Sequence, residues 1–319
     1  MKKILLVGTG YMAKEYFRVL KDLDVEIMVV GRGQTGADEF NKEFGILPKT
    51  GGVENYLKTC SERFDGAIVA VGVDVLKRTA IEVLRLNCSR ILLEKPGGLN
   101  FDEILELHEM SSNIDSQIFI AYNRRFYSSV NQAMKLIEED GGILSGNFEF
   151  TEWSHVIQEL KVSDNIKNNY FLANSSHVLD LAFYLMGKPK DLSSFADGDC
   201  GWHKPSIFAG SGITDRNVLF SYSANWESAG RWGIELLTAK RKLVLRPMEK
   251  LFEQKLGELT VNEVNVNEAL IDDKYKPGVF KEVQAFLSEG SDSPLKTLDE
   301  QVQDIIWLNQ ILNGKKDSM

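Results

Sequence analysis

Long apolar runs and cysteines, which mark two large classes of proteins, are missing or scarce in this sequence. No apolar run approaches the roughly 20 residues that cross a bilayer, so we expect no transmembrane segment and no membrane partner. Cysteines occur only at Cys60, Cys88 and Cys200, which are too scattered for a metal-binding cage and odd in number for a set of disulfides. We therefore expect no metal site and a reducing, cytoplasmic compartment.

Positive charge is also in short supply. Lys and Arg number 37 against 46 Asp and Glu, a net charge of -9 at pH 7, which argues against a nucleic-acid partner because such proteins present a basic face. The sequence contains no internal repeats and no low-complexity segments. With 319 residues, 43% of them hydrophobic, the chain is long enough for two domains that each have a core.

A glycine-rich turn follows the first predicted strand, Lys3–Val7. This start resembles a signal peptide only superficially, because its apolar run is short and glycines follow at once. Gly8, Gly10 and Ala13 have the spacing of the dinucleotide-binding fingerprint, in which a tight turn lets the backbone approach a pyrophosphate. The N-terminus of the predicted helix Lys14–Leu23 adds free N–H groups and a positive dipole end. We expect cofactor contacts from Gly8, Thr9, Gly10, Tyr11, Met12 and Ala13.

The residues after the second predicted strand, Val25–Val30, bear on the choice of cofactor. NAD-binding folds usually place Asp or Glu at this point, where the acid holds the ribose 2'-hydroxyl. This chain has Arg32 within Gly31–Thr35 and no acid, and a guanidinium group favours a 2'-phosphate. We therefore favour NADP(H) over NAD(H) as the cofactor. The alternative is that Arg32 is an exposed loop residue.

Predicted strands and helices alternate from residue 1 to residue 121, which indicates a parallel doubly wound sheet. Its third strand, Gly66–Val71, ends at a further candidate for cofactor contact, Val71. Beyond residue 121 the apolar residues alternate, as in an antiparallel sheet with one wet face. We expect a Rossmann nucleotide-binding domain over 1–121 and an α+β substrate-binding and oligomerisation domain over 122–319. Strands of the second domain are expected at 143–153, 192–197, 218–226, 232–238 and 242–245, the last two as a hairpin, and helices at 126–139, 176–186, 279–287 and 298–312.

Two further motifs carry residue types suited to chemistry. Glu94 and Lys95 follow a short apolar strand and precede Pro96, which places them at the carboxyl rim of the sheet, where ligands bind in open α/β folds. We expect both to contact the cofactor. The alternative is a pair of solvated charges that close a strand. His177 and Asp180 lie three residues apart, on one face of a predicted helix. A lone helical histidine is usually structural, but beside a dinucleotide motif and a rim lysine we predict a catalytic one.

In their order and spacing, the motifs resemble those of the glucose–fructose oxidoreductase, inositol dehydrogenase and MocA (Gfo/Idh/MocA) family of oxidoreductases. The resemblance covers nearly the whole chain. It implies a Rossmann domain, a second domain whose open antiparallel sheet serves substrate and oligomer contacts, and NAD(P)-linked oxidation or reduction of sugars and polyols. It also implies that Lys95 and His177 flank the reacting carbon. The motifs are Gly8-x-Gly10-x-x-Ala13, Glu94-Lys95-Pro96, Tyr122-Asn123-Arg124-Arg125, His177-x-x-Asp180 with Gly187, and Tyr275-Lys276-Pro277-Gly278.

One departure from the family pattern lies just before the histidine. Many members have an aspartate four residues earlier, where this chain has Ala173. The missing carboxylate could have shared the proton of His177 or oriented its ring. Asn174 can still hydrogen-bond a sugar hydroxyl, but it cannot act as a base.

Several residues are candidates for contact with a sugar-like substrate. Arg124 and Arg125 could clamp a phosphate or carboxylate, or could simply bridge the two domains. Asn123 and Asn174 offer hydrogen bonds. Trp153 has a flat face suited to a pyranose ring, as do His155, Trp202, His203 and Trp226, of which we expect at least half to lie in the core.

We therefore expect hydride transfer between a nicotinamide and a secondary alcohol or ketone of a sugar or sugar derivative, with nucleotide-linked and acidic sugars among the options. His177 would take or give the hydroxyl proton, and Lys95 would stabilise the developing alkoxide. Asp180 would orient His177, and Glu94 would position Lys95. Two alternatives stay open, a reductase of a non-sugar substrate such as a cyclic imine, and a non-catalytic NADP(H) sensor. We expect a homodimer or homotetramer.

Overall fold

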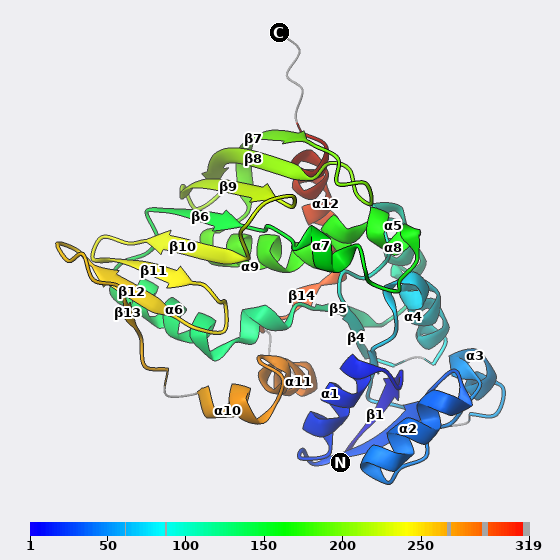
Figure 1. Ribbon diagram of the computed structural model, residues 1–319. Helices are drawn as coiled ribbons and strands as arrows, with labels where there is room; N and C mark the ends of the chain where they lie inside the picture. The colour runs from blue at the N-terminus through cyan, green and yellow to red at the C-terminus, as the bar shows by residue number, and fades with distance from the viewer. Residues whose placement is uncertain (61, 87, 267–268, 289–292, 315–319) are drawn as a thin grey trace. The chain divides into compact units, whose positions relative to one another are not determined.

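The computed structural model describes residues 1–60, 62–86, 88–266, 269–288 and 293–314 (Figure 1). The chain forms two compact units. The first comprises residues 1–123 and 274–303, and the second comprises residues 124–273 and the chain from residue 304 onward. The sequence predicted one break, between residues 121 and 122. None of the described helices is long and apolar enough to cross a membrane.

The sheet of the first unit is the predicted parallel, doubly wound sheet. Its strand order is β14-β5-β4-β3-β1-β2, and only β14 runs antiparallel to its neighbour. Strand β3 is buried along its whole length, and β1, β4 and β5 are buried beyond their first one or two residues, which explains their apolar sequences. The strands are β1 (Lys2–Val7), β2 (Val25–Val30), β3 (Gly66–Val69), β4 (Arg90–Glu94), β5 (Gln117–Ala121) and β14 (Lys296–Thr297), and the helices between them are α1 (Tyr11–Leu20), α2 (Gln34–Phe44), α3 (Gly52–Leu57), α4 (Leu76–Leu84) and α5 (Phe101–Ser111).

Residues far along the chain complete the first unit. Helix α11 (Val279–Leu287) buries Val279, Val283 and Phe286, and Glu282 on the same helix lies within hydrogen-bond distance of Tyr16 on α1. The prediction that this helix belongs to the second domain is wrong. Its amphipathic pattern shows that one face is buried, but the pattern does not say which sheet that face covers.

The second unit contains the predicted open sheet. Its order is β13-β12-β11-β10-β6-β9-β8-β7, and every neighbouring pair is antiparallel except β6 and β9. The hairpin predicted around residues 239–241 is present as β10 and β11. The strands are β6 (Ser145–Glu149), β7 (Pro189–Asp197), β8 (Ile207–Thr214), β9 (Leu219–Asn225), β10 (Gly233–Leu237), β11 (Arg241–Leu245), β12 (Phe252–Lys255) and β13 (Asn262–Glu263).

Strand β8 was not predicted, and its glycines explain why. Gly210 and Gly212 give the segment a loop-like sequence, since glycine is rare in strands. In the sheet they leave room for neighbouring aromatic rings. A Cβ on Gly210 would collide with the ring of Tyr222, and one on Gly212 would collide with the backbone of Asp191 and the ring of Phe220.

Helix α9 (Ser176–Met186) has the bounds predicted from the sequence, and every residue in it except Tyr184 is buried. It packs on the sheet, where the ring centres of Phe183 and Phe148 lie 5.4 Å apart. A π-helical turn, Phe171–Ser175, precedes it, and such turns are frequent at functional sites. The remaining helical elements of the described residues are η1 (Val73–Val75), η2 (Asn123–Phe126), α6 (Ser128–Glu139), α7 (Ser154–Ile157), α8 (Asp164–Asn168), α10 (Ala269–Lys274) and α12 (Leu298–Asn313).

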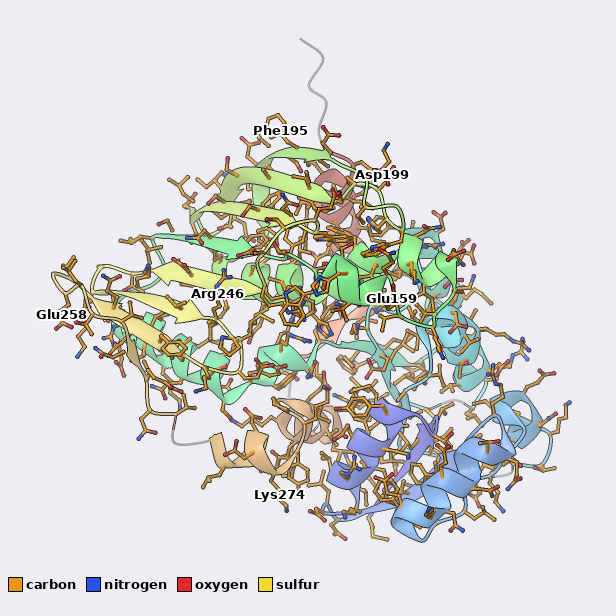
Figure 2. All side chains as sticks on the ribbon, viewed as in Figure 1. Glu159, Phe195, Asp199, Arg246, Glu258 and Lys274 are labelled. Atoms are coloured by element: carbon orange, nitrogen blue, oxygen red, sulfur yellow. The ribbon has the colours of Figure 1, made fainter. Side chains whose placement is uncertain are left out.

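The other face of the second sheet carries exposed side chains. Phe195 on β7 is 68% exposed, and Figure 2 shows it projecting away from the sheet. Ile207 on β8 and Leu219 on β9 are also exposed. They alternate with buried residues along their strands, so the strands present one covered face and one exposed face that carries these three large apolar side chains among polar ones.

Candidate functional site

A pocket of about 540 Å³ lies where β1 and β3, which are neighbours in the sheet, lead into separate loops. This is the topological switch point of the sheet, because the chain leaves β1 for β2 on one side and returns to β3 on the other. Pockets of this volume suit a small molecule or part of a cofactor. Of the predicted cofactor residues, seven line it: Gly8, Thr9, Gly10, Tyr11, Met12, Arg32 and Val71.

The two glycines of the turn do different things. Gly8 has φ +124°, and a Cβ there would collide with the backbone of Ala70. Gly10 is the N-cap of α1, and a Cβ there would meet nothing within 4 Å. Ala13 lies beneath the turn, fully buried, and does not line the pocket. Gly8 is therefore needed for the turn itself, whereas Gly10 leaves space in front of the helix N-terminus.

The first turn of α1 has no acidic residue and no capping side chain. The positive end of the helix dipole at these N–H groups is therefore not balanced by a negatively charged or hydrogen-bonding side chain of the first turn. Space above Gly10 and uncapped N–H groups below it fit the pyrophosphate of a dinucleotide.

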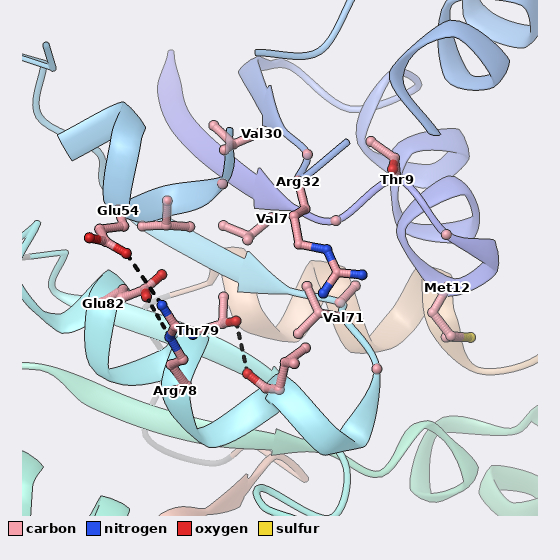
Figure 3. A pocket seen from close by; sticks show the side chains of 18 of the residues that line it. Val7, Thr9, Met12, Val30, Arg32, Glu54, Val71, Arg78, Thr79 and Glu82 are labelled. Atoms are coloured by element: carbon pink, nitrogen blue, oxygen red, sulfur yellow. Dashed lines mark hydrogen bonds and ion pairs between the residues drawn. The ribbon is translucent and has the colours of Figure 1, made fainter. Parts of the chain in front are cut away.

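Arg32 is exposed and extends across the pocket toward Val71 (Figure 3). Acidic residues of the pocket come from other elements, and the sequence did not identify them. Glu54 and Glu82 both pair with Arg78, at 3.3 Å each, as the dashed lines in Figure 3 show. Glu54 lies on α3 and Glu82 on α4, the helices that follow β2 and β3. This position after a strand of the sheet is the one sequence signal that could have identified them.

Glu94 closes β4 in a buried position and does not line this pocket. Its Oε1 accepts a hydrogen bond from the hydroxyl of Tyr16 at 3.0 Å, and the same hydroxyl lies 3.2 Å from Oε2 of Glu282. Burial raises the pKa of Glu94 and of Glu282 above the ordinary value for glutamate. Lys95, which is half-buried, follows Glu94 directly, so this acidic cluster supports the end of the strand that carries it.

The residues after the strand are also anchored. The side-chain amide of Gln301 donates to the carbonyl of Pro96 at 3.0 Å. Asn123, predicted as a substrate ligand, is buried and donates from Nδ2 to the carbonyl of Pro277 at 2.9 Å. This bond connects the residues after β5 to the loop before α11. The side-chain amide of Asn123 therefore has a structural role.

In the second unit, Arg125 and Asp180 form a buried bidentate pair. Nε and Nη2 of Arg125 donate to the two carboxylate oxygens of Asp180 at 2.8 and 2.7 Å. Both side chains are less than 10% exposed. The charge of Arg125 is thus balanced inside the unit, so its predicted role as a substrate clamp is not what this geometry favours. The role predicted for Asp180 toward His177 stays a prediction.

Sequence reasoning missed Glu152, which is 1% exposed and follows β6. Its Oε1 accepts hydrogen bonds from Asn174 at 3.0 Å and from Ser175 at 2.8 Å, both on the π-helical turn. Its Oε2 lies 3.2 Å from Nη1 of Arg231. Burial raises the pKa of Glu152, and these three donors act in the opposite direction. No motif in the sequence marks this residue.

Aromatic and cationic side chains gather beside Glu152. The ring centre of Trp232 lies 6.2 Å from that of His177, 4.9 Å from Cζ of Arg124 and 4.7 Å from Cζ of Arg231. Arg231 also lies over Trp153, at 4.8 Å. The cluster therefore brings together four of the predicted site residues, Arg124, Trp153, Asn174 and His177, with the unpredicted Glu152, Arg231 and Trp232.

The other aromatic candidates behave as the sequence led us to expect. Trp202, His203 and Trp226 are buried and pack on one another, with 5.6 Å between the two tryptophan ring centres. His155 is exposed. Among the residues that the structure describes, no group of three or more His, Cys, Asp and Glu side chains could hold a metal ion.

No protein-family model matches this sequence, and no curated protein matches it either. Solved structures do match over nearly the whole chain. A levoglucosan dehydrogenase in complex with NADH and L-sorbose superposes with a TM-score of 0.76 at 16% identity, covering 97% of this chain and 95% of that one. An Agrobacterium radiobacter oxidoreductase in complex with NAD+, L-tartaric acid and magnesium gives 0.74 at 15% identity, with the same two coverages.

A third similar structure is the UDP-N-acetylglucosamine 3-dehydrogenase GnnA from Acidithiobacillus ferrooxidans. Its TM-score is 0.71 at 13% identity, covering 98% of this chain and 96% of that one. At such low identity the likeness shows the fold alone. The two-unit fold predicted from the sequence is thus one that NAD-binding oxidoreductases also adopt.

Proposed function

We propose that this chain is an NAD(P)-dependent oxidoreductase acting on a secondary alcohol or ketone of a sugar or sugar derivative. The observation that carries the proposal is the pocket at the switch point, with the positive φ of Gly8 and the open space above Gly10. Similar structures named as sugar or sugar-nucleotide dehydrogenases support it, since they share the fold over more than 90% of each chain. We assign the chain to the Gfo/Idh/MocA type on the same grounds.

The residues of the first unit fit a dinucleotide. Gly8–Met12 would hold the pyrophosphate, and Val71 would contact the cofactor from the loop that follows β3. Arg32 would hold a 2'-phosphate, because the loop directly after β2, residues 31–33, contains no carboxylate to repel one. We therefore propose NADP(H) as the preferred cofactor. When bound, the nicotinamide supplies or accepts the hydride.

Two side chains would handle the proton and the charge of the reacting group. His177 takes or gives the hydroxyl proton, since imidazole titrates near neutral pH. Lys95 donates a hydrogen bond to the same oxygen and stabilises its negative charge. Glu94 positions Lys95 through the backbone they share, and Asp180 positions His177 from the same helix face. Asn174 and Trp153 contact the substrate.

The test is the substitution Lys95→Met in the full-length protein. We expect turnover to fall by about a hundredfold to ten-thousandfold, with NADPH binding retained, because Lys95 does not line the pocket at the glycine turn. Turnover is measured by NADP+ reduction over a panel of sugars, sugar acids and sugar nucleotides. Lys190→Met, an exposed lysine on β7, is the matched control. Unchanged turnover in the Lys95 variant would remove this residue from the mechanism.

The panel also separates this proposal from its rivals. Tight NADPH binding with no turnover on any compound would favour a non-catalytic sensor, as the absence of a carboxylate at Ala173 suggests. Turnover only on imines or other non-sugar compounds would favour the reductase. Glu152 argues for catalysis, because it supplies a buried carboxylate bonded to the residues that directly follow Ala173.

We further propose that the chain assembles as a homodimer or homotetramer. The exposed apolar residues on the outer face of the second sheet, among them Phe195 and Leu219, support this. Sedimentation of the purified protein measures the assembly directly, and a monomer at all concentrations would contradict it.

A further inference from the structure

We infer that the substrate carries an oxyanion, either a carboxylate or a phosphate group, and that Arg124 and Arg231 hold this group beside Trp232. The inference rests on the proposed function in one respect, that the second unit binds the substrate. It deepens that function by naming the chemical class of the substrate. It also replaces the predicted pair of Arg124 and Arg125 by a different pair.

Among the described residues of the second unit, no carboxylate pairs with Arg124. Among the residues that the structure describes, its guanidinium donates no hydrogen bond and forms no ion pair, and its Nε is buried without a hydrogen-bond partner. The neighbouring Arg125, by contrast, has both carboxylate oxygens of Asp180. Burial lowers the pKa of Arg124, and the nearby charge of Arg231 adds to that effect. A half-buried guanidinium with an unused donor is costly unless a ligand supplies an acceptor.

Arg231 brings a second positive charge to the same ring. Its Cζ lies 4.7 Å from the centre of Trp232, against 4.9 Å for Arg124. The ring attracts both guanidinium groups through its π face and keeps them near each other despite their like charge. The indole Nε1 of Trp232 is buried and has no hydrogen-bond partner among the described residues. The guanidinium groups of Arg124 and Arg231 thus lie beside Trp232, whose own indole N–H has no acceptor among the described residues.

The acidic groups near this cluster do not neutralise it. Glu152 binds Arg231, but two of its bonds go to Asn174 and Ser175. Glu249, the other carboxylate that influences Arg124, is exposed and forms no ion pair with it. One buried carboxylate therefore faces two guanidinium groups, and one more negative charge would balance them. Planar guanidinium groups bind carboxylate and phosphate oxygens with paired hydrogen bonds.

The position of the cluster connects this charge to the proposed chemistry. His177 lies 6.2 Å from Trp232, ring centre to ring centre. An oxyanion held at Trp232 would lie near the imidazole that handles the hydroxyl proton. The substrate would then be a small molecule that has both a hydroxyl group and an anionic group, such as a sugar acid, a sugar phosphate or a hydroxy acid.

The test compares neutral and anionic members of matched pairs. Full-length protein saturated with NADPH, and separately with NADH, is titrated calorimetrically with D-glucose, D-glucuronate and D-glucose 6-phosphate, and with threitol and tartrate. The reduced cofactor prevents turnover of the alcohols. We expect one anionic member to bind at least about tenfold more tightly than its neutral partner, with an affinity that falls as salt rises. The glucuronate and phosphate arms distinguish the two kinds of oxyanion.

Three variants assign the preference to residues. Arg124→Gln should weaken binding of the anionic member by about tenfold to a hundredfold and leave the neutral member unchanged. Arg124→Lys should retain part of the preference, because it keeps the charge but loses the paired hydrogen bonds. Arg231→Lys should behave similarly and keeps a cation beside Glu152, so that the unit folds. Arg216→Gln, an exposed arginine after β8, is the control and should change nothing.

Equal affinity for both members of every pair, including no measurable binding of either, overturns the inference. So does an equal loss for neutral and anionic members in Arg124→Gln. Turnover of neutral sugars without any anion preference would refute the inference and leave the proposed dehydrogenase standing. Anion binding that depends on Arg124, in a protein that turns over none of the compounds, would support the inference and refute the proposed dehydrogenase.

Discussion

The two units of the chain build their candidate sites from different materials. In the first unit, the pocket is shaped by backbone: Gly8 lies so close to the backbone of Ala70 that a Cβ would not fit, and Gly10 faces open space. In the second unit, the site is made of side chains, in which Arg124, Arg231 and Glu152 surround Trp232. The first site is sensitive to added volume, whereas the second is sensitive to the balance of charge. Substitutions should therefore damage the two sites in different ways.

The largest effect is expected from breaking the buried ion pair of the second unit. Asp180→Ala leaves Arg125 charged and unpaired in the interior, which should cost about 3 to 5 kcal/mol of unfolding free energy. Urea unfolding measures this cost. The double variant Arg125→Met with Asp180→Leu should recover much of it, and the exposed Asp191→Ala is the control. A cost below about 1 kcal/mol would show that the pair is not effectively buried.

The glycine turn offers the steric counterpart of that experiment. Gly8→Ala should destabilise the first unit by about 1 to 3 kcal/mol, since its φ is +124° and the added methyl meets the backbone of Ala70. Gly10→Ala should leave the melting temperature unchanged, because its Cβ meets nothing, but should weaken NADPH binding about tenfold or more. Thermal melting and fluorescence titration measure the two effects. Gly33→Ala, which also meets nothing, is the control, and unweakened binding in Gly10→Ala would place the pyrophosphate elsewhere.

The first unit also contains buried titratable groups, in the cluster of Tyr16, Glu94 and Glu282. Burial raises the pKa of Glu282 well above the ordinary value for glutamate. The folded state therefore keeps a proton that the unfolded chain releases, and stability should fall as the pH rises above about 4.5 toward the folded-state pKa. Glu282→Gln cannot ionise at this position, so the stability of this variant should fall less than that of the wild type as the pH rises.

Melting curves of wild type and Glu282→Gln from about pH 5 to about pH 8 measure the difference. The advantage of the variant should grow with pH over this range. Glu258→Gln, an exposed glutamate of the second unit, is the control. Parallel pH profiles of wild type and Glu282→Gln would show that Glu282 already ionises normally in the folded protein.

The smallest effect is expected at Arg32, which is exposed at the edge of the pocket. Arg32→Ser should weaken NADPH binding about fivefold and leave NADH binding unchanged, because an exposed ionic contact contributes about 1 kcal/mol. Titration of both cofactors measures the preference. Arg85→Ser, an exposed arginine outside the pocket, is the control. Equal losses for both cofactors would contradict a contact with the 2'-phosphate.

Some features could be predicted because their causes are local. The turn at Gly8 and Gly10 is a matter of backbone freedom over a few residues, and helix 176–186 ends at a glycine with positive φ. The hairpin of β10 and β11 follows from two apolar runs separated by a short turn. Strand β8 was missed because Gly210 and Gly212 conceal it, although the rings of Phe220 and Tyr222 require small residues there.

The amino-acid sequence by itself determined the alternation of strands and helices, the glycine turn and the residue types available for chemistry. Only the tertiary structure decided that Arg125 binds Asp180, that Arg231 and Glu152 meet, and that residues 274–303 complete the first unit. The physical reason is range. Turns and helices follow from neighbouring residues, whereas contacts between distant residues depend on which strands pair and which faces become buried.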